Sequence, residues 1–289
     1  MTPLLSVRNL RVSFPTRAGT IEAVRGVSCD LGRERLGVVG ESGSGKSMTG
    51  RAILGLVRPP GRVTADRMDL DGESILNLPE ARMRKLRGAR ISMVMQDPKF
   101  SLNPVMTVGR QIMESYRLHS GQGGQAARAK ALDMLRAVQI RDPERVFDAY
   151  PHEVSGGMGQ RIMIAMMLAP DPEILIADEP TSALDVSVRN EVLRIMDHLV
   201  RDRGMGLILI SHDLNLVGQF CDRVLIMYAG RVLEELPARD LHAARHPYTR
   251  GLLASLPRLD RPVPRLPTLR REDSWRDEAS ALPSTQGTP

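Results

Sequence analysis

A glycine-rich loop near the start of the chain constrains the fold more than any other stretch. Residues 40–47 read Gly-Glu-Ser-Gly-Ser-Gly-Lys-Ser, after an apolar run at 36–39 and before a stretch, 48–56, that favours a helix. A loop of the form G-x-x-x-x-G-K-[ST] between a strand and a helix is a P-loop, whose backbone N–H groups surround a phosphate. Lys46 is expected to contact the β- and γ-phosphates of a nucleotide, and Ser47 to bind Mg²⁺. The alternative is a Gly/Ser turn that carries a lysine by chance.

Composition limits the remaining possibilities. The 289 residues suffice for one large domain, or a domain with an extension, and 42% of them are hydrophobic. Aromatic residues make up only 3%, so we expect an aliphatic core that the 16 methionines help to fill. The two cysteines form no metal-binding spacing or disulfide framework, which indicates a reducing compartment. The first residues lack the features of a signal peptide, and no apolar run approaches the roughly 18 residues of a membrane helix.

The chain is basic, with a net charge of +6 that comes mainly from arginines. A basic chain can bind nucleic acid or a membrane surface. Because the arginines are scattered rather than grouped in blocks, we favour a solvated surface.

Strand-like stretches flank the P-loop. Residues 4–14 and 23–31 are predicted to form an antiparallel edge, with a turn marked by Pro15 and Gly19. Phe14 is either a platform on which a nucleobase stacks or a buried strand residue. Gln96 ends a predicted strand at the side where ligands bind in open α/β sheets. It could reach Mg²⁺ and the attacking water there, or it could merely cap the strand.

The chain changes character from about residue 98 to 169, which we predict to be a helical insertion between strands. Helices are expected over 106–118 and 126–138, with a flexible link at 120–124. Ser155-Gly156-Gly157 lies where a further apolar helix begins, which makes a second anion site. Two phosphate-binding helix starts separated by an insertion suggest that two chains enclose a nucleotide between them.

Two adjacent acids end the buried strand that begins at residue 173. Asp178 would hold Mg²⁺ directly or through a water, and Glu179 would act as a general base on the attacking water. The alternative is an acidic turn before Pro180. His212 lies just past the last predicted core strand, 206–211, and this position favours contact with a γ-phosphate over a structural role.

Taken together, these stretches resemble an ATP-binding cassette (ABC) ATPase, the motor subunit of an ABC transporter, over about residues 4–257. The motifs of that family occur in order. They are Walker A at 40–47, the Q-loop at Gln96, the signature at 155–157, Walker B at 178–179, the D-loop at 182–185 and the switch at His212.

The resemblance implies an α/β P-loop NTPase fold. Its parts would be an antiparallel β edge subdomain, a mainly parallel core sheet and an α-helical insertion subdomain. The nucleotide-binding domain would span 1–235, with the helical subdomain at about 98–169, and a C-terminal extension would span 236–289.

The resemblance also assigns roles to single residues. Glu179, His212 and Gln96 would be catalytic, and Mg²⁺ would be bound by Ser47, Gln96 and Asp178. ATP would be bound by an aromatic ring, the Walker A loop, the signature of a partner chain and the D-loop, which here are Phe14, Gly40, Ser42, Gly43, Ser44, Gly45, Lys46, Ser47, Met48, Ser155, Gly156, Gly157 and Asp185.

A closer resemblance is to the ATPases of peptide and nickel importers. It rests on residues 40–47, 96–98 with 101–104, 150–153 and 246–249. Met158 and Gly159 depart from the usual signature, which has glutamine and often arginine at these positions. Met158 is typical of one of the two non-identical ATPases in such importers. Some relatives carry a cysteine-rich iron–sulfur segment in the extension, and because no cysteine follows Cys221 we expect no cluster here.

The implied function is that of an ATP-hydrolysing motor of a bacterial importer, a peripheral protein at the cytoplasmic face of the inner membrane. The expected partners are two integral-membrane permeases, a second, non-identical ABC ATPase and, through the complex, an extracytoplasmic solute-binding protein, but no nucleic acid. Di- or oligopeptides are the expected cargo, with nickel, opines or glutathione-type molecules as alternatives. A soluble ABC ATPase acting on nucleic acid and a free-standing ATP-binding regulator are the other possibilities.

The end of the chain offers no motif. About thirty final residues are rich in Pro, Arg and Ser, and we expect them to be disordered. If so, deletion of the tail after Leu259 should leave ATP hydrolysis in the assembled complex intact.

Overall fold

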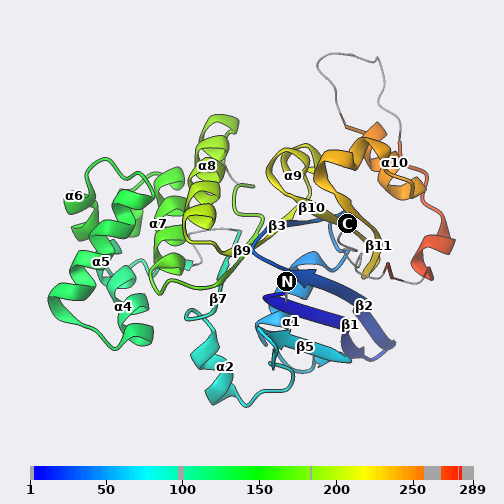
Figure 1. Cartoon of the computed structure of the whole chain (residues 1–289), viewed down its shortest axis with the longest axis horizontal. Helices are drawn as coiled ribbons and strands as arrows, with labels where there is room; N and C mark the ends of the chain where they lie inside the picture. Colours follow the sequence, from blue (N-terminus) through cyan, green and yellow to red (C-terminus); the bar gives the residue numbers. More distant parts are fainter. Residues whose placement is uncertain (1–2, 97–100, 183, 257–267, 279, 282–289) are drawn as a thin grey trace. The chain divides into compact units, whose positions relative to one another are not determined.

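The computed structural model describes residues 3–96, 101–182, 184–256, 268–278, 280 and 281 (Figure 1). Three predictions fall partly outside this range, because Asp97-Pro98, Ala183 of the D-loop and much of the tail are not described. The chain divides into two compact units. The first, the P-loop unit, comprises Met1–Asn77 and Leu209–Pro289, and the second, the helical unit, comprises Leu78–Ile208. Residues after 236 therefore belong to the same unit as the P-loop.

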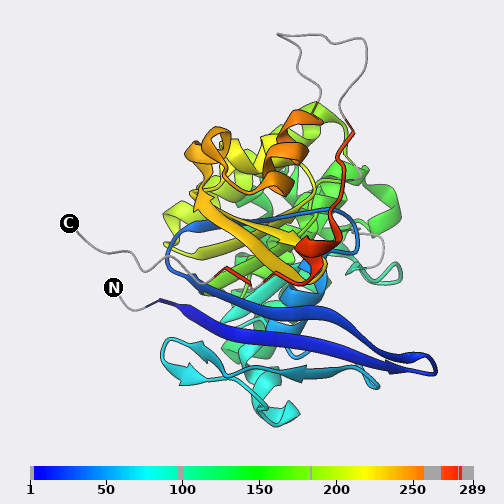
Figure 2. The same ribbon diagram turned by 90° about the vertical axis from the view of Figure 1, so that its right-hand side faces the viewer.

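An antiparallel sheet begins the P-loop unit. Figure 2 shows β1 (Leu5–Thr16) and β2 (Gly19–Leu31) as a long hairpin. The sheet has the order β2-β1-β5-β6, with β5 at Arg67–Leu70 and β6 at Glu73–Ser74, and β4 (Arg62–Thr64) also pairs with β1. The predicted antiparallel edge is confirmed, but Pro15 lies inside β1 and the turn is at residues 17 and 18. β5 pairs with β1 at residues 5–8 and β4 at residues 11–13, so Pro15 lies beyond both, at an edge of the sheet where a proline is tolerated.

A bulge keeps the buried face of β1 in phase. Leu5 and Val7 are fully buried, and the pairing register shifts before Leu10 and Val12, which are fully buried as well. Asn9 has a φ of 50° at this point. The extra residue at the bulge keeps Leu10 and Val12 on the buried face, whereas in a regular strand both side chains would have pointed toward solvent.

The P-loop follows a second set of strands in the same unit. β3 (Arg35–Val39) runs parallel to β10 (Arg223–Tyr228), and β10 forms an antiparallel hairpin with β11 (Arg231–Pro237), as predicted. On its other side β3 neighbours β9 (Gly206–Ser211), of which residues 209–211 belong to this unit. The helices are α1 (Lys46–Ile53), α9 (Leu214–Phe220), α10 (Pro247–Ala254) and the 3-10 turns η2 (Ala238–Ala243) and η3 (Asp273–Arg276).

The helical unit contains a parallel strand pair, β7 (Ile91–Val94) with β8 (Ile174–Asp178), in which every residue is buried. Its helices are α2 (Glu80–Leu86), α4 (Val108–Ser120), α5 (Gly124–Ala137), α6 (Pro143–Asp148), the 3-10 turn η1 (Pro151–Glu153), α7 (Gly156–Leu168) and α8 (Val186–Asp202). The predicted helices 106–118 and 126–138 are confirmed to within two residues. None of the described helices combines the length and the apolar character that crossing a membrane requires.

The spacing of apolar residues does not reveal two short helices of this chain, α6 and α9. α6 has only six residues, but Asp142 caps it by accepting a hydrogen bond from the Arg145 N–H, and Pro143 occupies its first turn. These are ordinary signals of a helix start. α9 likewise begins at a capping aspartate, Asp213. Caps, rather than apolar spacing, would have located both helices.

The described part of the tail differs from the expectation of disorder. Residues 268–278 are placed, and Trp275 in η3 is only 4% exposed. Its ring lies edge-on to the rings of Tyr228 and Tyr248. The polar composition of the tail conceals this anchor, because a single aromatic side chain, which buries about 150–250 Å², can fix an otherwise polar segment.

Both cysteines are buried as free thiols. Burial raises the pKa of Cys29 to about 12, and burial likewise raises the pKa of Cys221 to about 12. At pH 8 roughly one thiol in ten thousand would then be ionised, and the thiolate is the reactive form. We therefore expect iodoacetamide at pH 8 to leave both cysteines of the folded chain unmodified and to modify both in guanidinium chloride, as measured by mass spectrometry. Rapid labelling of either cysteine in the folded chain would contradict the burial.

Candidate functional site

The P-loop can only follow its path with glycine at two positions. A Cβ atom on Gly40 would lie 2.1 Å from the Met227 carbonyl oxygen of β10, so no side chain fits between this loop and the strand. Gly45 caps α1 with a φ of 99°, and a Cβ there would lie 2.5 Å from the Ala23 carbonyl oxygen. Left-handed backbone and close backbone contact are what glycine alone provides. The loop therefore rests on β2 and β10 at the same time.

Lys46 lies inside the loop. Its side chain is almost fully buried, and its Nζ donates to the carbonyl oxygens of Gly40 at 2.7 Å and Glu41 at 2.8 Å. A buried ammonium is stable only with such partners. The α1 N-terminus has no side-chain cap and no acidic residue in its first turn. The loop thus combines a buried cation with a helix start that favours an anion, which fits a phosphate.

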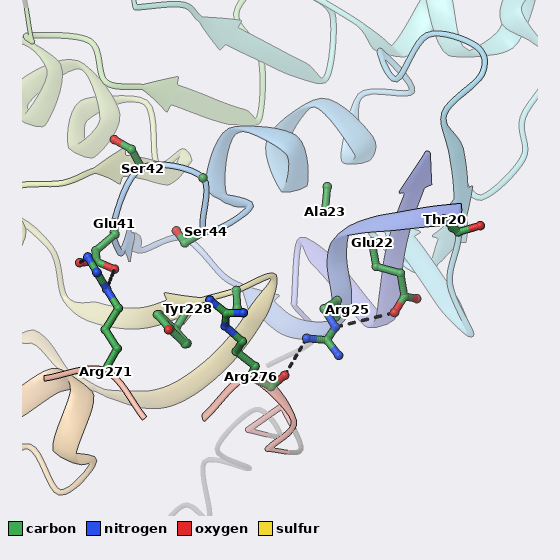
Figure 3. Close-up of a pocket in the computed structure, with 12 residues that line it drawn as sticks. Thr20, Glu22, Ala23, Arg25, Glu41, Ser42, Ser44, Tyr228, Arg271 and Arg276 are labelled. Atoms are coloured by element: carbon green, nitrogen blue, oxygen red, sulfur yellow. Dashed lines mark hydrogen bonds and ion pairs between the residues drawn. The ribbon is translucent and has the colours of Figure 1, made fainter. Parts of the chain in front are cut away.

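Two cavities flank the P-loop in this unit. The first, which we call the arginine cavity, has about 620 Å³ and is lined by Glu41, Ser42, Gly43 and Ser44 of the loop, with Ala23 of β2 and three arginines, Arg25, Arg271 and Arg276. Figure 3 shows these side chains around the loop. The second, which we call the histidine cavity, has about 480 Å³ and is lined by Gly40, Glu41 and Ser42, by His212 and by Leu252 and Leu256. The structure therefore brings His212 beside the P-loop, and its contact with a γ-phosphate stays a prediction.

Two predicted nucleotide-binding residues of this unit lie elsewhere. Phe14 is half-buried and pairs with Ile21 across the β1–β2 hairpin, and a methyl on Gly61 would lie 2.6 Å from its ring. It does not line either cavity. Met48 is half-buried in α1 and does not line them either. Their contact with a nucleotide stays a prediction.

The helical unit brings one of the Walker B acids, Glu179, to Gln96. Asp178 ends β8 and is buried, whereas Glu179 follows at a φ of 46°. The Glu179 carboxylate accepts a long hydrogen bond, 3.4 Å, from the exposed Gln96 side chain. A non-glycine residue at positive φ costs about 1 kcal/mol or more and recurs at functional sites. Among the described residues, no group of three or more His, Cys, Asp or Glu side chains is placed to hold a metal ion.

The signature stretch begins α7, as predicted. The Ser155 hydroxyl caps this helix by accepting a hydrogen bond from the Met158 N–H at 3.3 Å. Ser155 and Gly156 are exposed, and a Cβ on Gly156 would meet no atom within 4 Å. Gly157 instead faces α8, since a Cβ there would lie 2.6 Å from Val188. The helix start is open to an approaching anion on the side of Ser155 and Gly156.

Asp185 of the D-loop caps α8. Its carboxylate accepts hydrogen bonds from the Val188 N–H at 3.0 Å and the Ser187 hydroxyl at 2.7 Å. These hydrogen bonds, the Val188 amide first, hold the pKa of Asp185 below its usual value. The residue therefore has a structural role whether or not it meets a nucleotide.

Comparison with known proteins decides the family. Residues 24–182 match the family described as ABC transporter, which is more than half of the chain. The chain belongs to the ABC transporter family. Relatives of this ABC protein include the dipeptide transport ATP-binding protein DppD of Bacillus subtilis, 48% identical over 263 residues that cover 90% of this chain and 78% of the relative. DppD of Escherichia coli is 44% identical over 268 residues, 92% of this chain and 82% of the relative.

Solved structures confirm the P-loop NTPase fold of the ABC protein. A dimeric structure of a bacterial ABC transporter cassette matches with a TM-score of 0.72 at 26% identity, over 81% of this chain and 99% of that one. A dimeric post-hydrolysis structure of an ATP-binding cassette bound to ADP and Pi matches with a TM-score of 0.70 at 28% identity and the same coverage.

Sequence reasoning missed the residues that the ABC protein's C-terminal extension brings to the P-loop. Arg271 lines both cavities, and the Tyr248 hydroxyl accepts a hydrogen bond from the Glu41 N–H at 3.3 Å. Tyr248 lies in the stretch 246–249 that carries the importer resemblance, so a signal was available. Nothing in the sequence marks Arg271, which is one arginine among many.

The cap at Asp185 can be tested by two substitutions. Asp185→Ala should lower the melting temperature, whereas Asp185→Asn should keep most of the cap because asparagine caps helices well. The carboxylate with a lowered pKa stabilises the folded state above its usual pKa, and this contribution is lost as the pH falls through the lowered value. The advantage of the wild type over Asp185→Asn should therefore be constant above about pH 5 and shrink below about pH 4. Thermal unfolding across pH measures both effects, and an unchanged melting temperature for Asp185→Ala would exclude a stabilising cap.

Proposed function

We propose that this chain is the ATP-binding and ATP-hydrolysing subunit of a bacterial ABC importer, with di- or oligopeptides as cargo. The observation that carries the proposal is the P-loop, closed around the buried Lys46 ammonium, in a chain that matches dipeptide transport ATP-binding proteins over nine-tenths of its length. The Walker A loop supplies the cation and the helix start that an ATP triphosphate needs.

The site residues of the P-loop unit have separate roles in this proposal. Lys46 would exchange its bonds to the Gly40 and Glu41 carbonyl oxygens for phosphate oxygens, which keeps a buried ammonium paired throughout. His212, which lines the histidine cavity together with the loop, would hold the γ-phosphate. Ala23 lines the arginine cavity with Ser44. Phe14 of β1 would stack on the adenine.

The residues of the helical unit would act on the attacking water and on a second nucleotide. Glu179 would accept a proton from the water, and Gln96, already bonded to its carboxylate, would hold the water in line. The open helix start at Ser155 and Gly156 would close over the ATP bound by a partner ATPase. That two similar cassettes have dimeric structures supports such a pairing of subunits.

Mg²⁺ suits the residue types present. Ser47, and separately Gln96 and Asp178, carry the oxygen ligands that this hard cation takes. When bound, the ion would neutralise charge on the phosphates.

The importer context supplies the remaining partners. We propose that two membrane permeases, a second ABC ATPase and an external binding protein complete the transporter, with this subunit at the cytoplasmic face of the membrane. The dipeptide transport names of the relatives support this assembly and the peptide cargo. Nickel, opines or glutathione-type molecules would use the same motor with other permeases.

ATP-driven uptake tests the assignment. Vesicles that contain this chain, its co-encoded permeases, the second ATPase and the binding protein should take up short peptides. Uptake should require ATP on the side of the membrane where this chain lies. Lys46→Ala should abolish uptake because the phosphate loses its buried cation, whereas Lys85→Ala, an exposed lysine of α2, should not. Uptake of nickel in place of peptides would keep the motor and change the cargo, and ATP-independent uptake would refute the motor role.

Hydrolysis tests the assignment of Glu179. Glu179→Gln should leave ATP binding intact and lower turnover by at least about a hundredfold, the contribution of a general base. Glu114→Gln, an exposed carboxylate of α4, is the matched control and should keep full turnover. Phosphate release and equilibrium binding of ATP, measured on the same preparations, separate the two effects. Undiminished hydrolysis by Glu179→Gln would remove this residue as the base.

A further inference from the structure

The described part of the C-terminal tail is fixed to the P-loop unit at several points. We call residues 268–278, 280 and 281 the C-terminal strap. The Arg276 carbonyl oxygen accepts hydrogen bonds from Arg25 at 2.7 Å and from Arg231 at 3.0 Å. Farther along, the Ala281 N–H donates to the Val232 carbonyl oxygen of β11 at 2.7 Å. Figure 3 shows Arg271 and Arg276 of the strap beside the P-loop.

Trp275 anchors the strap. It is the only tryptophan of the chain, and its ring centroid lies 5.7 to 6.2 Å from those of His246, Tyr248 and Tyr228. Edge-to-face contacts at this spacing are favourable for aromatic rings. His246 also pairs with Glu278 of the strap at 3.0 Å. The anchor ties the strap to both β10 and α10.

Glu41 of the P-loop is held by the strap and by α10. Its carboxylate accepts two hydrogen bonds from the Arg271 guanidinium, at 2.8 and 3.2 Å, and its N–H donates to Tyr248. Its carbonyl oxygen accepts from Lys46. Every polar group of Glu41 therefore has a partner. The partners of its N–H and of its carboxylate, Tyr248 and Arg271, both come after position 247.

Arg271 matters for the P-loop because it faces the negative charge of Glu41. A carboxylate in a phosphate-binding loop repels an anionic ligand unless another charge neutralises it. The bidentate guanidinium of Arg271 neutralises that carboxylate and fixes its direction. The pair is partly exposed, with 60% of the Arg271 side chain and 30% of the Glu41 side chain accessible, so salt should weaken it.

We propose that Arg271 is a positioning residue of the nucleotide site, through which the C-terminal strap raises the affinity of the P-loop for ATP. The inference rests on the proposed ATP binding at this loop, but not on the cargo or on the assembly. It replaces the expectation that the tail can be removed without effect.

Equilibrium binding of ATP with Mg²⁺ to the purified full-length chain tests this. Arg271→Gln should weaken ATP binding by about three- to fivefold at low salt, the size expected for a partly exposed ion pair, and by less at high salt. Arg271→Lys keeps the charge and should restore most of the affinity. Arg270→Gln is the matched control, since the exposed side chain of Arg270 makes no ion pair with the described residues.

A double substitution separates positioning from general stability. In a Glu41→Gln background the carboxylate is gone, so Arg271→Gln should then change the affinity by less than about twofold. The fluorescence of Trp275 reports whether the strap stays anchored in each variant, and thermal unfolding reports whether the chain is folded.

The outcomes distinguish the two proposals. Unchanged or tighter binding by Arg271→Gln, an equal loss in Arg270→Gln, or an equal loss in the Glu41→Gln background would overturn the role of Arg271 while ATP binding stands. A wild-type chain that binds no ATP would refute the proposed function itself. Should Arg271→Gln fail to fold, Arg271→Lys decides: its small loss of affinity relative to the wild type should vanish in the Glu41→Gln background, and an equal loss in both backgrounds would overturn the role of Arg271.

Discussion

The close contact of the P-loop with two distant strands determines what the rest of the site can do. Gly40 lies against the carbonyl group of Met227 in β10, and Gly45 lies against that of Ala23 in β2. With no room for a side chain at either position, the loop has one path, and that path directs the Gly40 and Glu41 carbonyl oxygens at the Lys46 ammonium. Packing against two strands holds the loop in this arrangement, which lowers the ordering that binding of a phosphate requires.

The parts of this site that the sequence predicts are those whose geometry is local. A glycine at the start of α1, Ser155 at the start of α7 and Asp185 at the start of α8 each act on the helix that follows them, so spacing along the chain suffices to find them. The structure adds where these helices lie within the two units, which spacing along the chain does not give. The contact of Arg271 with Glu41 joins residues 230 positions apart and follows from tertiary packing alone. No periodicity or motif encodes such a contact, and composition suggested disorder instead.

Several motif residues serve the fold as well as the proposed chemistry. Ser155 and Asp185 use their side-chain oxygens as helix caps, so the same oxygen atoms cannot be freely reoriented toward a nucleotide. Glu179 stands at a positive φ that turns the chain directly after β8. A substitution at any of these positions therefore alters local structure and chemistry together. Binding and turnover must be measured separately before a loss of activity is assigned to either.

Arginine provides the tertiary contacts that a chain poor in aromatic residues lacks. The scattered arginines suggest a solvated surface, yet the Arg223 side chain is only 13% exposed and binds both Glu34 and Glu235. Arg90 likewise holds Glu173 with two hydrogen bonds. The planar guanidinium can bind a carboxylate through two donors while its stem covers apolar surface. Arg271 applies the same geometry to Glu41, and because that carboxylate belongs to the P-loop, a contact that elsewhere only joins two segments here bears on the binding of a phosphate.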